Sequence, residues 1–151
     1  MVHDDVVRRC HDEALAVRRV KDSLRITLDW KAPSVAMPRK LSSVAFIIRS
    51  LQRHLERQLA LEEDGGYMEV VAQEKPNLQD HAEKLREEHD LFREVLRDIL
   101  PSVEELTPDD ESRFQQLCGE INSLLQRLEL HDAEEAELLS VALLTDEGGE
   151  G

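Results

Sequence analysis

The sequence predicts an all-α protein, an up-down-up-down bundle of four helices. Four segments carry apolar residues at alternating spacings of three and four, which is the period of one face of a helix. No segment shows the period-two alternation of a half-buried strand. Aromatic residues make up only 3% of the 151 residues, while Leu, Arg and Glu abound, as is typical of helical bundles.

The length suits a single domain with a core of its own. We expect the bundle to occupy residues 1–145 and the acidic, glycine-rich tail 146–151 to be disordered. Two cysteines, Cys10 and Cys118, are too few for a disulfide framework and are expected to be reduced thiols. No apolar run approaches the roughly 18 residues of a membrane span, and the N-terminus lacks the apolar segment of a signal peptide.

A net charge of −14 argues against a nucleic-acid partner, because phosphate binding requires clustered Lys and Arg. Together with the absence of a membrane-spanning or signal segment, this predicts a soluble cytoplasmic protein with no membrane partner. The sequence does not identify a protein partner.

The first two helices are predicted from their apolar stripes and their ends. The first runs roughly from Asp4 to Asp29, and the prolines of the following segment end it. The second begins near Pro38, a residue suited to a first helical position, and ends at Gly65–Gly66. The first stripe consists of Val7, His11, Ala14, Val17, Leu24 and Leu28; the second consists of Leu41, Val44, Ile48, Leu51, Leu55, Gln58 and Glu62.

A short helical connector is expected after Gly66, broken at Pro76. The third helix should open with Asn77 as its cap and end at Pro101. The fourth should open with Thr107 as its cap and Pro108 at its first position. Their stripes are Leu78, Ala82, Leu85, His89, Phe92, Leu96 and Ile99, and Phe114, Leu117, Ile121, Leu124, Leu128, His131, Glu135 and Leu138.

Polar residues interrupt all four stripes. In an antiparallel bundle, early positions of the first and third helices meet late positions of the second and fourth, so these residues are expected to share a layer near one end of the core. His89, nearly central in its helix, fits this layer less sharply than the others. The interrupting residues are His11, Gln58, Glu62, His89, His131 and Glu135.

A bound cation would explain this layer. Burying two bare carboxylates costs several kcal/mol, and no Lys or Arg of the four stripes lies near them. A single His on an apolar face is more often a hydrogen-bonded core residue, and only the whole set favours a metal. His131 and Glu135 lie on one face a turn apart. Mixed His and carboxylate ligands in a bundle core are typical of non-haem iron or manganese, and zinc is not excluded.

The arrangement resembles the hemerythrin-like, or HHE, cation-binding domains. Their pattern is a His in the first helix, His-x3-Glu in the second, a His in the third and His-x3-Glu in the fourth. The matching stretches are "RCHDEAL" with His11, "RQLALEEDGGY" with Glu62, "REEHDLF" with His89 and "LELHDAEEAELL" with His131 and Glu135. The resemblance covers roughly residues 4–145.

Gln58 stands where this family has the His of its second helix. Its amide oxygen is a poorer ligand for iron than an imidazole. His54, one turn earlier, would substitute only by reaching down a full turn. The resemblance therefore leaves open whether one or two metals bind.

The resemblance implies a non-haem iron site, diiron or mononuclear, that binds oxygen, nitric oxide or peroxide, or senses iron or redox state. We find no separate nucleophile, Ser/His/Asp set or phosphate loop, so a binding or sensing module is favoured over a dedicated enzyme. The alternative is a degenerate, metal-free bundle that acts as an interaction or structural protein. Gln58 favours this alternative, and the retained acids Glu62 and Glu135 favour a metal.

Overall fold

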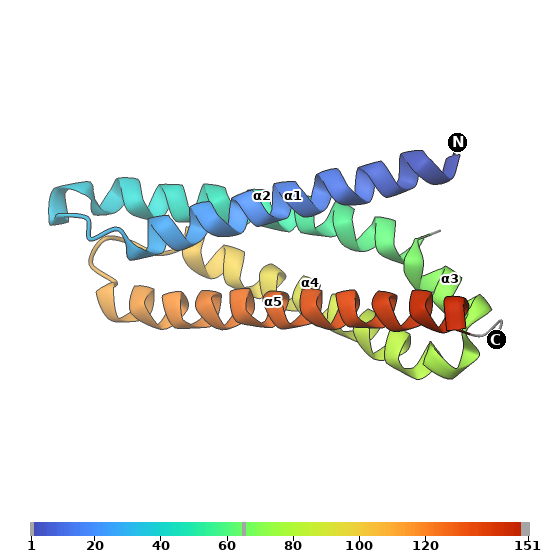
Figure 1. Ribbon diagram of the computed structural model, residues 1–151. Helices are drawn as coiled ribbons and strands as arrows, with labels where there is room; N and C mark the ends of the chain where they lie inside the picture. The colour runs from blue at the N-terminus through green and yellow to red at the C-terminus, as the bar shows by residue number, and fades with distance from the viewer. Residues whose placement is uncertain (1, 65, 149–151) are drawn as a thin grey trace.

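The computed structural model describes the backbone of residues 2–64 and 66–148, and side chains within residues 5–142 except residues 6, 7 and 65. Four long helices, α1 (Val2–Asp29), α2 (Met37–Glu63), α4 (Gln79–Glu104) and α5 (Glu111–Gly148), alternate in direction along one axis (Figure 1). The predicted all-α, up-down-up-down bundle is confirmed.

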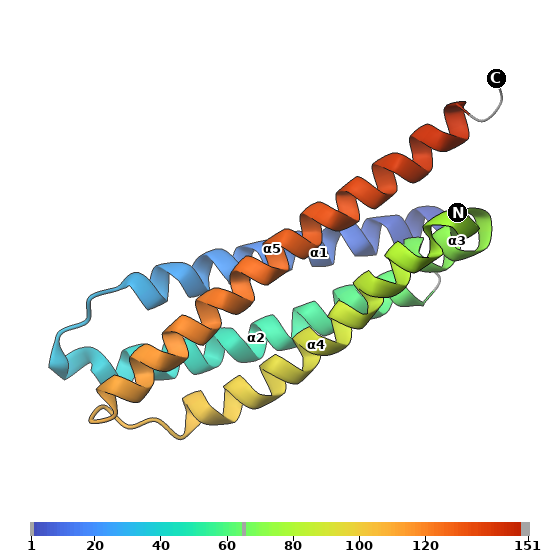
Figure 2. The same ribbon diagram turned by 90° about the horizontal axis from the view of Figure 1, so that it is seen from below.

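Three short elements join the long helices. The connector helix α3 (Tyr67–Glu74) lies across one end of the bundle, as the sequence predicted, and single turns of 3₁₀ helix occupy Ser34–Ala36 and Pro76–Leu78. Neighbouring helices in the chain pack on one another, whereas α1 and α5 meet over only a short stretch (Figure 2). Helix α1 therefore packs mainly on α2.

Two apolar cores lie on either side of a polar layer. The larger fills the end with the α1–α2 and α4–α5 connections and includes Leu51, Phe92 and Leu128. The smaller joins α3, α4 and α5 around Leu85 and Leu138. On α4 the residue between the two cores is His89, and on α5 the residues between them are His131 and Glu135.

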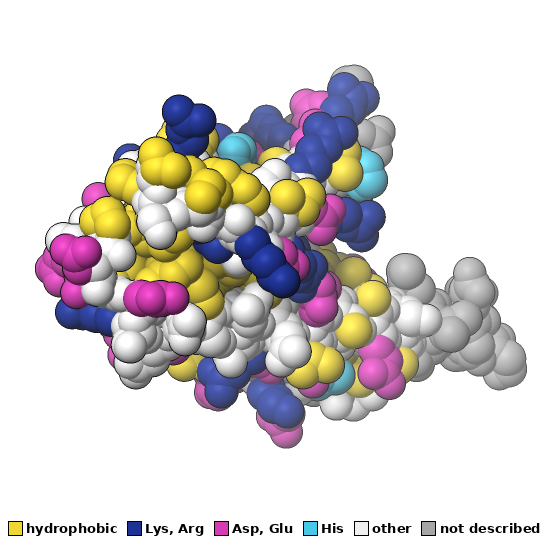
Figure 3. Space-filling view, turned by 90° about the vertical axis from the view of Figure 1, so that its left-hand side faces the viewer, with side chains coloured by type: hydrophobic (Ala, Val, Ile, Leu, Met, Phe, Trp, Pro, Cys, Tyr) yellow, Lys and Arg dark blue, Asp and Glu magenta, His cyan; other side chains and the backbone are white. Residues whose placement is uncertain are grey.

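A buried lysine stabilises the end of the bundle that carries the α1–α2 and α4–α5 connections. Lys40 is only 7% exposed, and its Nζ donates to the carbonyl oxygens of Leu28 at 3.0 Å and Trp30 at 2.6 Å. These carbonyls lie at the C-terminal end of α1, where oxygens lack partners within the helix. Figure 3 looks onto this end, and the exposed apolar residues Val35 and Trp30 belong to the connection there.

Several predicted helix ends are wrong by a few residues. Pro101 lies inside α4, which continues to Glu104 because the amide of Glu105 still bonds the Pro101 carbonyl at 3.0 Å. Asn77 sits in a 3₁₀ turn and caps nothing. Thr107 does not open α5: its amide and hydroxyl both donate to Asp110, whose own carbonyl accepts the first helical bond.

The predicted boundary at residue 145 falls inside a helix. Helix α5 runs to Gly148, so the expected tail begins within it, and residues 149–151 lie outside the described part of the chain. Cys10 and Cys118 are free thiols, as expected. Within the described residues, no helix combines the length and the apolar character that crossing a membrane requires.

Candidate metal centre

Four buried side chains from three helices converge in the polar layer. They are Glu62 of α2, His89 of α4, and His131 and Glu135 of α5. Each offers one ligand atom, and these atoms all lie within 4.8 Å of one another. Two ligand atoms on opposite sides of one cation lie about 4.0–4.4 Å apart, because metal–ligand distances are about 2.0–2.2 Å, so a slight inward movement would bring all four to a single cation.

His89 stands at the centre of the group. Its Nε2 lies 3.1 Å from Nε2 of His131, 3.3 Å from Oε2 of Glu62 and 3.4 Å from Oε1 of Glu135. The Nε2 of His131 in turn lies 2.5 Å from the same oxygen of Glu135, as the one-turn spacing predicted. Both imidazoles therefore present Nε2 to the carboxylates.

A carboxylate outside the group orients each imidazole. Nδ1 of His89 lies 2.8 Å from Glu63, and Nδ1 of His131 lies 3.1 Å from Glu88. A proton on each Nδ1, donated to these acceptors, leaves the lone pair of each Nε2 facing the layer. Metal-binding histidines are commonly held in this way, which fixes both their tautomer and their ring direction.

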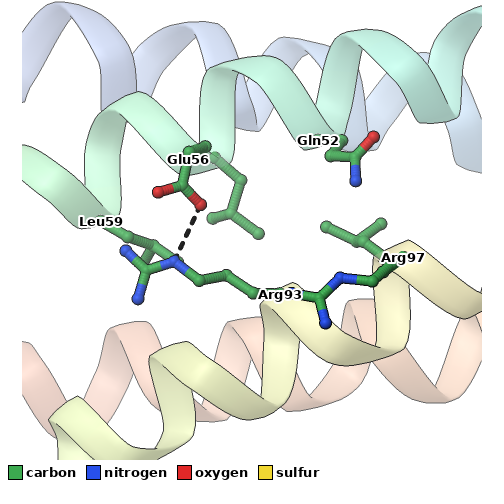
Figure 4. A pocket seen from close by; sticks show the side chains of 7 residues that line it. Gln52, Glu56, Leu59, Arg93 and Arg97 are labelled. Carbon is green, nitrogen blue, oxygen red and sulfur yellow. Dashed lines mark hydrogen bonds and ion pairs between the residues drawn. The ribbon is translucent and has the colours of Figure 1, made fainter.

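Glu63 is itself held by a bidentate pair with Arg93, whose two terminal nitrogens lie 2.9 and 3.0 Å from its oxygens. Arg93 also binds Glu56 at 2.8 Å, and Figure 4 shows it reaching across a cavity of about 290 Å³ between α2 and α4. Burial alone would raise the pKa of Glu63, but hydrogen bonds from Arg93 and His89 outweigh it and lower the pKa. Glu63 thus stays a carboxylate.

The pKa values of the two carboxylates of the layer, Glu62 and Glu135, are shifted in opposite directions. Burial raises the pKa of Glu62 to about 7, despite its contact with His89. For Glu135, hydrogen bonds from His131 and His89 outweigh burial and lower the pKa to about 2. Burial would likewise lower the pKa of His89, but the surrounding carboxylates raise it to about 10. In the metal-free chain, protons therefore offset part of the negative charge.

The structure places Gln58 one turn from Glu62 on the same inward face, as predicted. Its amide nitrogen donates to Oε1 of Glu62 at 3.0 Å, and its own Oε1 is buried without a hydrogen-bond partner. Oε2 of Glu62 is also buried, and it lies 3.3 Å from Nε2 of His89. Buried polar atoms normally have partners, and an unpartnered amide oxygen beside these carboxylates fits a group that binds oxygen ligands.

The expectation that His11 points into the core is wrong. Its side chain is exposed, and it does not join the other four residues. Among the described residues of α1, the buried ones are Val17, Lys21, Leu24 and Leu28, and their spacing continues inward to position 10 rather than 11. Cys10 is half-buried, and burial together with the charges of Glu62 and Glu135 raises the pKa of its thiol.

His54 does not complete the layer either. It pairs with Glu13 of α1, with Nδ1 and Oε2 at 3.0 Å. Sequence reasoning also missed the supporting residues Glu63 and Glu88 and the buried hydroxyl of Tyr67. The acidic pairs "EE" that accompany Glu62 and His89 were the only available signal for the first two.

The fold and the layer together define a helical bundle with a buried His/Glu cluster suited to a metal. The family model of the hemerythrin HHE cation-binding domain matches residues 2–143, nearly the whole chain. The chain therefore belongs to the hemerythrin HHE cation-binding family. No curated protein and no solved structure is similar enough to count as a match.

Proposed function

We propose that this protein binds non-haem iron in the layer of Glu62, His89, His131 and Glu135 and uses it to bind or sense oxygen, nitric oxide or peroxide. The observation that carries the proposal is the set of four buried ligand atoms within 4.8 Å. Iron suits a mixed imidazole and carboxylate set, as do manganese and zinc. When bound, the metal supplies the site for the small ligand, and the bundle supplies geometry and exclusion of water.

The ligand set favours one firmly held metal and a weaker second position. Four side chains already face one point, and Gln58 adds only an amide oxygen beside Glu62. The exposed position of His11 removes an imidazole that a second metal would use. We therefore propose mononuclear or substoichiometric loading, with His11 joining only if the first turns of α1 rotate.

The second candidate is a metal-free bundle that acts as an interaction or structural protein. The electrostatics of the layer favour it in one respect: a raised pKa for His89 and Glu62 allows protons to neutralise much of the layer. The amide oxygen of Gln58 counts against it, because it is buried without a hydrogen-bond partner.

Metal content distinguishes the two candidates. The protein is purified without chelators, analysed for iron, manganese and zinc, and then titrated anaerobically with Fe(II). We expect about one metal per chain in the wild type and almost none in His89→Ala. His81→Ala is the matched control, since His81 lies on the same helix two turns away and outside the cluster. Wild-type protein that takes up no metal would establish the metal-free alternative.

Ligand binding is tested on the loaded protein. Nitric oxide added to the Fe(II) form and azide added to the Fe(III) form should each change the visible absorption and the electron paramagnetic resonance spectrum. A metal that is bound but reacts with neither probe would point to a structural ion rather than a ligand-binding centre.

A further inference from the structure

The cavity between α2 and α4 combines an apolar wall with a polar rim (Figure 4). Its volume of about 290 Å³ is near the lower end of the range in which proteins hold small molecules, roughly 300–1,000 Å³. The wall consists of Leu55, Leu59 and Leu96, three buried side chains of the larger core. None of the four residues of the metal layer lines this cavity, so it is a separate feature of the bundle.

Two charged residues of the rim already neutralise each other. The Nε of Arg93 donates to Glu56 at 2.8 Å, and both side chains line the cavity. The two terminal nitrogens of Arg93 donate to Glu63, and one of them also donates to Asp90 at 3.0 Å. All three nitrogens of Arg93 are therefore engaged with carboxylates of this chain.

Arg97 and Gln52 complete the rim with donors that are not engaged. Arg97 lies one turn beyond Arg93 on α4, and Gln52 lines the cavity from α2 (Figure 4). Neither side chain has a hydrogen-bond or ion-pair partner among the residues that the structure describes. Because Arg93 and Glu56 offset each other, Arg97 gives the lining of the cavity its net positive charge.

We propose that this cavity binds a small monocarboxylate with a short apolar chain, such as hexanoate. The planar guanidinium of Arg97 matches the two oxygens of a carboxylate, and the amide nitrogen of Gln52 is a further donor. The apolar chain of the ligand lies against the three leucines. A net charge of −14 repels anions from most of the surface, so recognition depends on this local cation.

The test titrates the full-length protein with hexanoate and follows the backbone amide resonances of Leu55, Leu59 and Leu96 by nuclear magnetic resonance. Chelator is present, so the carboxylate cannot bind iron in the layer and the result does not depend on the proposed function. We expect saturable shifts of these resonances in the wild type. Arg97→Gln should bind hexanoate about tenfold more weakly, because a hydrogen bond to a charged group contributes at least this factor.

Arg53→Gln is the matched control. It removes the same charge from an exposed position of α2 beside Gln52 and outside the cavity, and it should change hexanoate affinity less than twofold. Equal weakening in the two variants would reduce the effect to general electrostatics and overturn the proposal, as would a wild type without saturable shifts.

Two further probes separate the parts of the site. Hexanol has the apolar chain without the charge, and inorganic phosphate has the charge without the chain. Both should bind more weakly than hexanoate. Hexanol that binds as tightly as hexanoate would make the cavity merely apolar, and phosphate that binds as tightly would show that the leucine wall has no part in recognition; either result contradicts the proposal.

Discussion

The carboxylate of Glu63 lies 2.8 Å from Nδ1 of His89, while the neighbouring Glu62 lies 3.3 Å from Nε2 of the same ring. Two consecutive residues at the end of α2 thus contact opposite edges of one imidazole from α4. This arrangement directs the basic nitrogen of His89 into the layer, and the pair of Glu63 with Arg93 holds the orientation.

Glu63→Gln should weaken metal binding without unfolding the protein. The amide keeps the size of the side chain but loses the charge that holds His89 and Arg93. Loss of such an outer partner typically lowers metal affinity by about 10–100-fold. Glu56→Gln is the control, because Glu56 binds the same Arg93 and does not contact His89. Anaerobic Fe(II) titration of the two variants gives the comparison, and equal affinities would show that Glu63 has no orienting role.

His11→Ala should leave metal affinity within about threefold of wild type, because the side chain is exposed and lies outside the cluster. His131→Ala, at a buried position of the cluster, should abolish binding. Metal content after dialysis measures both. A comparable loss in the two variants would mean that α1 rotates on loading and brings His11 to the metal.

Gln58→His should strengthen loading toward two metals per chain. The new imidazole would lie one turn from Glu62 on the same face, where Gln58 now offers only an amide oxygen. We expect tighter Fe(II) binding and stronger charge-transfer absorption with azide. Wild-type protein that already binds two irons equally tightly would show that Gln58 does not weaken the site.

The metal-free protein should lose stability as the pH rises from about 5 to 9. Glu62, whose folded pKa is raised to about 7, holds a proton that the unfolded chain releases, so its ionisation opposes folding above pH 4.5. His89, whose pKa is raised to about 10, contributes stability below pH 6.5 that is lost as the pH approaches 10.

Urea unfolding at several pH values in the presence of chelator measures this loss. Glu62→Gln should remove on the order of 2 kcal/mol of the pH dependence. Added Fe(II) should reverse the trend, because metals bind deprotonated ligands and their stabilisation grows with pH. A stability that stays constant across this range in chelator would contradict the raised pKa values.

Gly66→Ala should destabilise the protein by about 1–3 kcal/mol, since the added methyl group meets two backbone carbonyls that cannot move aside easily. Gly119→Ala is the matched control. Its Cβ would meet nothing within 4 Å, and replacing a helical glycine by alanine stabilises by about 0.5–1 kcal/mol. Thermal unfolding should therefore shift in opposite directions, and a shift in the same direction would refute the close approach at Gly66.

The four helices and their inward faces were predictable because the apolar periodicity of a long amphipathic helix depends only on the local chain. The layer of Glu62, His89, His131 and Glu135 was predictable for the same reason: polar residues interrupt otherwise apolar stripes. The helix ends predicted at Pro101 and Thr107 were wrong. These ends are decided by the hydrogen bonds of Pro101 with Glu105 and of Thr107 with Asp110, and the sequence does not show the geometry of these bonds.

The register of α1 was decided by tertiary contacts. Lys21 lies on its buried face and pairs with Asp132 of α5 at 3.4 Å. This charged residue therefore belongs to the inward stripe of α1, which shifts the stripe so that Cys10 takes the inward position predicted for His11. The orienting contacts of Glu63 and the burial of the Tyr67 hydroxyl likewise depend on how α2, α3 and α4 meet. Local sequence determines which face of a helix is apolar, whereas the partners of a buried polar atom come from other helices and are decided only by packing.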